Sequence, residues 1–89
     1  MMSYSDHKHI TIRGLILPSE WDDKGNVISI SISTFDEDEY LVDMDRVSKR
    51  LLSHMREGVE ASGLVREEEG IKKIKIKKYR INNILLVSQ

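Results

Sequence analysis

The stretch that decides the fold is VISISIST, residues 27–34, in which isoleucines alternate with serines. Successive side chains of a β-strand point to opposite faces, so a period of two predicts a strand with one apolar and one hydroxyl face. We therefore expect Ile28, Ile30 and Ile32 to face a core together, and the intervening serines to face outward.

A second strand is predicted on the N-terminal side, over residues 10–17, where apolar residues share one parity. We expect it to end at Pro18, which has no backbone N–H to give to a ladder. The residues between the two strands include DDKGN, positions 22–26. Asp and Asn bond their own main chain and Gly accepts a left-handed backbone, so this sequence predicts a turn and the two strands a hairpin.

The pattern changes further along the chain. Residues 39–44 predict a third strand, after which apolar residues recur every four positions between Val47 and Met55. That spacing is typical of an amphipathic helix. Asp45 can accept the free amides of its first turn, and Gly58 stands where a left-handed cap is expected.

The last part of the chain returns to a period of two. Residues 59–66 and 71–81 predict two more strands, joined by the turn EEEG at 67–70. In the final strand the apolar parity switches near Lys77 and Lys78, which predicts a β-bulge.

Five strands with one helix between the third and fourth resemble the OB-fold, a Greek-key barrel. The resemblance is supported by VEASGLV at 59–65, followed by a charged turn and IKI at 74–76, and by Gly14 and Gly63, which can bend a strand sharply. It implies a mainly β barrel in which the fifth strand lies beside the first and approaches the third. The alternative is an open α+β sheet with the helix packed on one face.

The composition limits the architecture to one domain, because 89 residues bury only one small core. We expect a single domain over 1–89 with its core at about 8–82, and terminal extensions at 1–7 and 83–89. The apolar run Ile84 to Val87 is either a short packed segment or an exposed one. Without cysteine, an apolar stretch of membrane-spanning length or a signal-type N-terminus, the expectation is a cytoplasmic protein without a membrane partner.

The charge is divided along the chain although its net value is only −1. Residues 1–45 hold ten acids and three bases, whereas residues 46–89 hold eleven bases and five acids. In the last strand Lys73, Lys75 and Lys77 share a parity and predict an outward stripe that could bind a partner or a phosphate backbone. Two simpler interpretations are a solvated face that discourages edge pairing, and neutralisation by Glu39 and Asp43 across the barrel.

Three aromatic residues are further candidates. The OB-fold resemblance implies that Trp21, Phe35 and Tyr40 lie where such domains stack the bases of single strands. Their neighbours, however, are acidic at 22–23 and 36–39, and so is the turn at 67–69. These carboxylates would repel phosphates, and aromatic side chains that cap the barrel core are the alternative interpretation.

No catalytic trio has a recognisable spacing and no phosphate-binding glycine loop is present, so we expect no enzyme, no cofactor and no metal site. The function predicted from the sequence is a small non-catalytic binding module. It docks another protein through its charge-polarised surface. The alternative is binding of single-stranded nucleic acid through the basic last strand and the loop aromatics. The sequence leaves the oligomeric state open.

Overall fold

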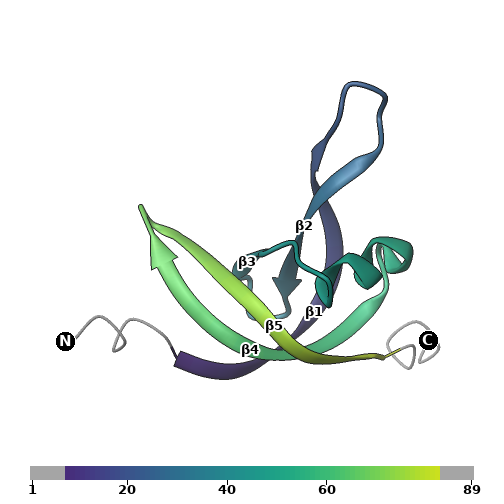
Figure 1. Cartoon of the computed structure of the whole chain (residues 1–89). Helices are drawn as coiled ribbons and strands as arrows, with labels where there is room; N and C mark the ends of the chain where they lie inside the picture. Colours follow the sequence, from purple (N-terminus) through teal and green to yellow (C-terminus); the bar gives the residue numbers. More distant parts are fainter. Residues whose placement is uncertain (1–7, 83–89) are drawn as a thin grey trace.

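Five strands close into a barrel in the computed structural model, which describes residues 8–82 (Figure 1). The elements are β1 (Lys8–Trp21), β2 (Val27–Thr34), β3 (Glu39–Val42), the 3₁₀ helix η2 (Ser48–His54), β4 (Gly58–Glu68) and β5 (Ile71–Ile81). The mainly β class, the OB-fold-like barrel and the helix between the third and fourth strands are confirmed. Closure of the barrel excludes the open α+β sheet. The predicted extensions 1–7 and 83–89, with Ile84 to Val87, lie outside the described residues.

The order of strands around the barrel is β1-β2-β3-β5-β4, with β4 returning to pair with β1. The expectation that the fifth strand lies beside the first is therefore wrong. β5 is the hairpin partner of β4 and lies parallel to β3 on its other side, so it has no edge left for β1. This order decides which acids stand near the lysines of β5.

The core fills the inside of the barrel and is made mainly of isoleucines. Its buried members are Ile12, Ile16, Ile30, Ile32, Tyr40, Val42, Leu51, Val59, Ala61, Ile74 and Ile76. Gly14 and Gly63 have the expected role, because a Cβ would lie 2.1 Å from the carbonyl oxygen of Ser33 at the first and 2.0 Å from that of Lys75 at the second. Adjacent strands could not approach so closely with any other residue at these two positions.

The predicted bulge in β5 is confirmed. Ser62 pairs with Lys78 and Gly63 with Ile76, so Lys77 is left without a partner in the register. One extra residue reverses the parity, and Tyr79 packs against the core although Lys77 does not. The turn before β5 is also as predicted, since Glu69 and Gly70 both have the positive φ that a two-residue hairpin turn requires.

The β1–β2 hairpin extends beyond the barrel as an arm, residues 19–29 (Figure 1). β1 does not end at Pro18. β4 pairs with β1 only as far as Leu15, so the proline lies beyond the β1–β4 ladder, where its missing N–H removes no bond to β4.

The expectation that Ile28 faces the core is wrong, because this residue is 49% exposed. Ile28 has no partner in the β1–β2 register, because Glu20 pairs with Ser29 and Trp21 with Val27. This extra residue reverses the parity, so Val27 packs against the core and Ile28 does not.

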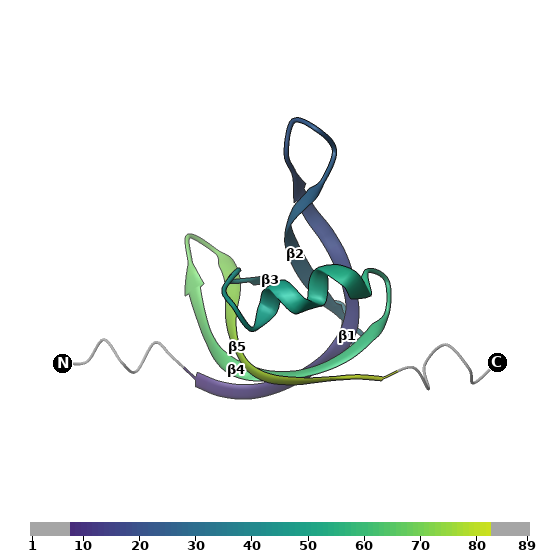
Figure 2. The ribbon, with the colours of Figure 1, turned by 45° about the vertical axis from the view of Figure 1, so that its right-hand side comes forward.

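The segment after β3 is a 3₁₀ helix and is shorter than the amphipathic helix predicted from Asp45 to Gly58. Asp45 Oδ1 accepts the N–H groups of Val47 at 3.1 Å and Ser48 at 3.0 Å, as expected. The prediction that Gly58 caps the helix is wrong, because Gly58 begins β4 and the positive φ of 67° belongs to Arg56. The reason is a backbone bond from the Arg56 N–H to the carbonyl of Ile16, which ends the helix early. Figure 2 shows η2 lying across the barrel below the arm.

Candidate functional site

The candidate site is a groove between the two hairpins that project from the barrel. One is the arm and the other is the β4–β5 hairpin, and the two diverge on either side of β3 (Figure 1). We call the groove the acidic groove; it is lined by Ser19, Glu37, Asp38, Glu39, Leu41, Gly70, Ile71 and Lys72. It therefore combines residues of the arm, the β2–β3 loop, β3 and the β4–β5 hairpin.

The apolar part of the acidic groove is formed by Leu41 and Ile71, the latter 49% exposed. Leu41 belongs to a row in which Leu17, Ser31 and Leu41 are register partners on the outer face of three strands. Ser31 was expected to face solvent, yet it is buried, with its hydroxyl donating to Glu39 Oε2 at 2.9 Å. The outer face of β2 is therefore covered here by leucines and a carboxylate.

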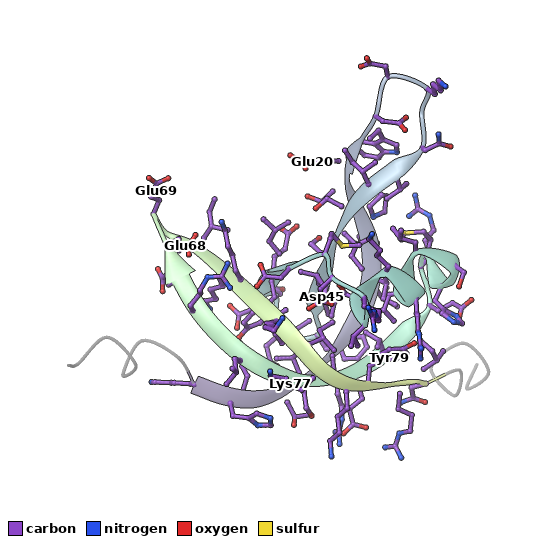
Figure 3. All side chains as sticks on the ribbon, in the orientation of Figure 1. Glu20, Asp45, Glu68, Glu69, Lys77 and Tyr79 are labelled. Carbon is purple, nitrogen blue, oxygen red and sulfur yellow. The ribbon has the colours of Figure 1, made fainter. Side chains whose placement is uncertain are left out.

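The rim of the acidic groove carries more negative than positive charge. Lys72 donates to Asp38 at 3.1 Å and lies 5.5 Å from the ring centroid of Tyr40. The bond to Asp38 raises the pKa of Lys72, so this lysine stays charged and held in place. Within residues 8–82, Glu37 and Glu69 have no ion pair. Figure 3 shows Glu20 on the arm and Glu69 at the tip of the other hairpin, so acids stand on both sides.

The predicted lysine stripe is largely neutralised by the chain itself. Lys73 binds Glu68 at 2.9 Å and Lys75 binds Asp45 at 3.0 Å. Hydrogen bonds from Arg66 and then from Lys73 lower the pKa of Glu68 to about 2, so this carboxylate is ionised at neutral pH. The lysines of β5 are thus paired with Asp38, Asp45 and Glu68, and not with the expected Glu39 and Asp43. Glu39 accepts from Ser31, and Asp43 pairs with Arg66 at 2.6 Å.

The third lysine of the stripe belongs to a different cluster. Lys77 and Lys78 are exposed and make no ion pair with another described residue of 8–82. Beyond them, Arg80 at 2.6 Å and Arg13 at 3.6 Å share the single carboxylate of Glu60. We call Arg13, Lys77, Lys78 and Arg80 the basic face, on the outer side of β1, β4 and β5. Sequence reasoning missed Arg13, because only the β1–β4 register places it beside Glu60.

The three candidate aromatics are not brought together. Trp21 is 55% exposed at the outer end of β1, and Phe35 is 58% exposed in the loop that follows β2. Tyr40 lies in the core, as the interpretation of a core-capping aromatic requires. Trp21 and Phe35 stand near opposite ends of β2, so they form no single platform on which successive bases could stack.

Two further features of the described chain concern metals and membranes. No three His, Asp or Glu side chains within 8–82 gather closely enough to hold a metal ion. No helix in this range is long and apolar enough to cross a bilayer.

Comparison with known proteins supports the fold. No family model matches the chain, and no curated protein matches it in sequence. Among solved structures, the chain is similar to the hypothetical protein ygiW from E. coli, with a TM-score of 0.60 and 24% sequence identity. The alignment covers 86% of this chain and 77% of that protein. At this identity the likeness shows the shared barrel alone, and the function has to be inferred from the surface.

Proposed function

We propose that the chain is a small non-catalytic module that docks a protein partner through the acidic groove. The observation that carries this proposal is the combination of exposed Ile71 and half-buried Leu41 with a rim of acids. Protein interfaces commonly have an apolar centre inside a polar rim, and exposed apolar patches mark such sites. In OB-folds generally, ligands bind across the second and third strands and the adjacent loops, and this groove shares with that region Leu41 of β3 and Gly70 of the β4–β5 turn.

The charge of the rim favours a basic partner. Glu37 and Glu69 have no ion pair among residues 8–82, so their charge remains available to an approaching molecule. Complementary charge speeds encounter and selects partners more than it adds affinity. Near a surface carboxylate a phosphate is instead repelled by about 1 kcal/mol at 4 Å in water-like dielectric.

Single-stranded nucleic acid remains the second candidate, on the strength of the basic face. Lys77 and Lys78 have no ion-pair partner in the described chain, and cations of this kind bind phosphates. Glu20 on the arm, next to Trp21, and Lys77 lie in separate parts of the molecule (Figure 3). A strand held by the lysines would not reach the exposed aromatics, and stacking would contribute little to its binding.

The buried polar groups and the cation of the groove are already bonded within the described chain. Each buried side-chain nitrogen or oxygen in residues 8–82 already has a hydrogen-bond partner. Lys72, the cation of the groove, is bound to Asp38. The groove thus offers an arrangement suited to recognition.

Selection from a displayed library of random peptides tests the proposal. We expect the enriched peptides to combine Lys or Arg with apolar residues. Their affinity should fall at least about tenfold, or about 1.4 kcal/mol, in a double variant with Ile71→Ser and Glu37→Gln. The matched control is Lys77→Gln with Lys78→Gln on the basic face, which should bind these peptides as well as the parent does. Enrichment of acidic peptides, or loss of binding in the control alone, would contradict the proposal.

A further inference from the structure

A second hollow lies on the outer side of the barrel, within the basic face. It has a volume of about 390 Å³ and is lined by Thr11, Glu60, Ser62, Lys78, Tyr79 and Arg80. We call it the outer hollow. It shares no lining residue with the acidic groove, so the two are separate sites.

The pairing of β1, β4 and β5 arranges the polar side chains of the outer hollow in two rows. One row consists of the register partners Thr11, Ser62 and Lys78. The next row consists of Arg13, Glu60 and Arg80, each two residues away on its strand. Side chains two residues apart on a strand point to the same face, so both rows stand on the outside of the barrel. Neighbouring strands are about 4.8 Å apart, which makes each row about 10 Å wide.

The bulge in β5 brings two lysines to this face. Ile76 is buried, so a regular alternation would turn Lys77 outward and Lys78 inward. The extra residue resets the parity, and both lysines are exposed, with Lys78 opposite Ser62. Figure 3 shows Lys77 on β5 well away from Glu69 at the tip of the β4–β5 hairpin. The acids of that hairpin therefore do not reach these cations.

The lysines of β5 differ in how their charge is used. Lys72, Lys73 and Lys75 each bind a carboxylate of the chain. Lys77 and Lys78 form no ion pair within residues 8–82. The charge beside the outer hollow is thus available to a ligand, whereas the charge further along the strand is used within the fold.

Glu60 does not cancel the positive charge of the outer hollow. Its Oε1 accepts from Arg80 at 2.6 Å, and its Oε2 lies 3.6 Å from Arg13. The hydrogen bond from Arg80 is the main cause that lowers the pKa of Glu60, so this carboxylate is ionised at neutral pH. One carboxylate stands among the four cations of the basic face. It holds the guanidinium of Arg80, whose side chain is 77% exposed and keeps further N–H donors for a ligand.

Two hydroxyl groups complete the set of donors. Thr11 Oγ1 and Ser62 Oγ are 2.7 Å apart, so one of the two O–H groups donates to the other oxygen. Neither hydroxyl forms another side-chain hydrogen bond within residues 8–82, which leaves the second O–H free to donate. Ser62 is only 8% exposed and lies at the floor of the hollow. An ammonium, a guanidinium and a hydroxyl donor thus line one hollow.

We propose that the outer hollow binds a phosphate group with two negative charges, either free phosphate or the terminal group of a small phosphomonoester. A phosphomonoester has a charge of about −1.5 to −2 at pH 7 and three acceptor oxygens, which match the three kinds of donor. Arginine in addition offers a planar fork that bonds two phosphate oxygens at once. A phosphodiester of a nucleic-acid backbone has one charge fewer and one free oxygen fewer, so it would leave a donor unused. This inference is independent of the docking function proposed for the acidic groove.

Nuclear magnetic resonance titration of the isotopically labelled protein tests the inference with three probes. These are inorganic phosphate, phenyl phosphate as a monoester and dimethyl phosphate as a diester. We expect inorganic phosphate to shift the backbone amides of residues 11, 62 and 78, and to bind at least about tenfold more tightly than dimethyl phosphate. Phenyl phosphate that binds as tightly as inorganic phosphate would assign the hollow to a phosphomonoester. Binding of inorganic phosphate alone would assign it to the free ion.

Two variants separate the charges from the hydroxyls. Lys78→Gln with Arg80→Gln removes two cationic donors at exposed positions and should weaken binding of inorganic phosphate at least about tenfold. Thr11→Val with Ser62→Ala keeps every charge and removes both hydroxyls, and should weaken binding about fivefold. The spectra used for the titration also show whether each variant is folded. Loss of binding in the first variant tests the inference even if the second does not fold.

The matched control is Lys49→Gln with Arg50→Gln, which removes the same charge from exposed positions of η2. This control and the groove variant Ile71→Ser with Glu37→Gln should bind phosphate as the parent does. If dimethyl phosphate binds as tightly as inorganic phosphate, or the control loses as much binding as the variant of Lys78, the face attracts anions only in general and the inference fails. It also fails if a folded hydroxyl variant binds like the parent, or if no probe shifts the three amides. None of these results bears on peptide binding by the acidic groove, so the docking proposal would stand or fall separately.

Discussion

At the scale of single residues, Gly63 shows how one position allows the barrel to close. The site where its Cβ would lie is 2.0 Å from the carbonyl oxygen of Lys75 and 2.8 Å from the carbon of that group. Both atoms belong to the backbone of β5, which cannot move away without breaking its ladder with β4. A side chain of any size therefore separates the two strands next to the Lys77 bulge.

Gly63→Ala should lower the free energy of unfolding by about 3 kcal/mol, at the upper end of the usual cost of overpacking. Gly25→Ala is the matched comparison. Gly25 has a φ of 89° and nothing within 4 Å of its ideal Cβ, so the substitution meets backbone strain but no clash. We expect it to cost about 1 kcal/mol. Urea unfolding of both variants measures the difference, and equal midpoints would show that β4 and β5 can separate freely at this point.

At the scale of elements, η2 depends on one carboxylate for its first turn. Asp45 accepts N–H groups of Val47 and Ser48 and also binds Lys75. The pKa of Asp45 is lowered from an ordinary 3.8 to about 2. The main cause is the hydrogen bond from the Ser48 backbone, and Lys75 contributes. The ionised form is therefore favoured by folding.

Asp45→Ala should cost about 1 kcal/mol of stability at neutral pH, the usual value of a lost cap. A folded-state pKa below the unfolded one adds stability above about pH 4, and this contribution is lost as the pH falls toward about 2. The difference between parent and variant should therefore shrink across that acid range. Thermal unfolding from pH 7 to pH 2 measures it, with Asp45→Asn as a control that keeps a capping oxygen but loses the titration. A difference that stays constant with pH would disprove the role of the carboxylate.

The elements that the sequence predicted well are those set by local rules. The bulge at Lys77 and the turn before Ile71 follow from parity and from turn residues close in the chain. The end of η2 could not be predicted, because it is fixed by a bond between Arg56 and Ile16, far apart in sequence. The expectation for Ile28 was wrong for a related reason. Ile28 is left without a partner where Glu20 pairs with Ser29 and Trp21 with Val27, and nothing in the alternating sequence marks that shift in register.

At the scale of the whole molecule, the division of charge along the chain becomes a division between surfaces. The acidic groove lies between the projecting hairpins, and the basic face covers the outer side of β1, β4 and β5. The sequence predicted Lys77 as an exposed cation. It did not predict that Lys73 and Lys75 are neutralised by Glu68 and Asp45, because those pairs depend on how the β4–β5 hairpin and the loop after β3 meet in space. Nor did it predict Leu41 and Ile71 as the apolar part of the groove.

This separation of charges leads to a prediction about single-stranded nucleic acid. At a salt concentration of about 0.15 M, where screening acts beyond about 8 Å, a few cations without stacking partners should not give submicromolar binding. At low salt, weak binding to the basic face should appear. It should be abolished by Lys77→Gln with Lys78→Gln and left unchanged by Trp21→Ala, because Trp21 stands on the arm among acids. Fluorescence anisotropy of labelled oligonucleotides over a range of salt gives both values. Submicromolar binding at 0.15 M that Trp21→Ala weakens would mean that the lysines and the aromatics act on one strand after all, and nucleic acid would then replace a basic protein segment as the ligand.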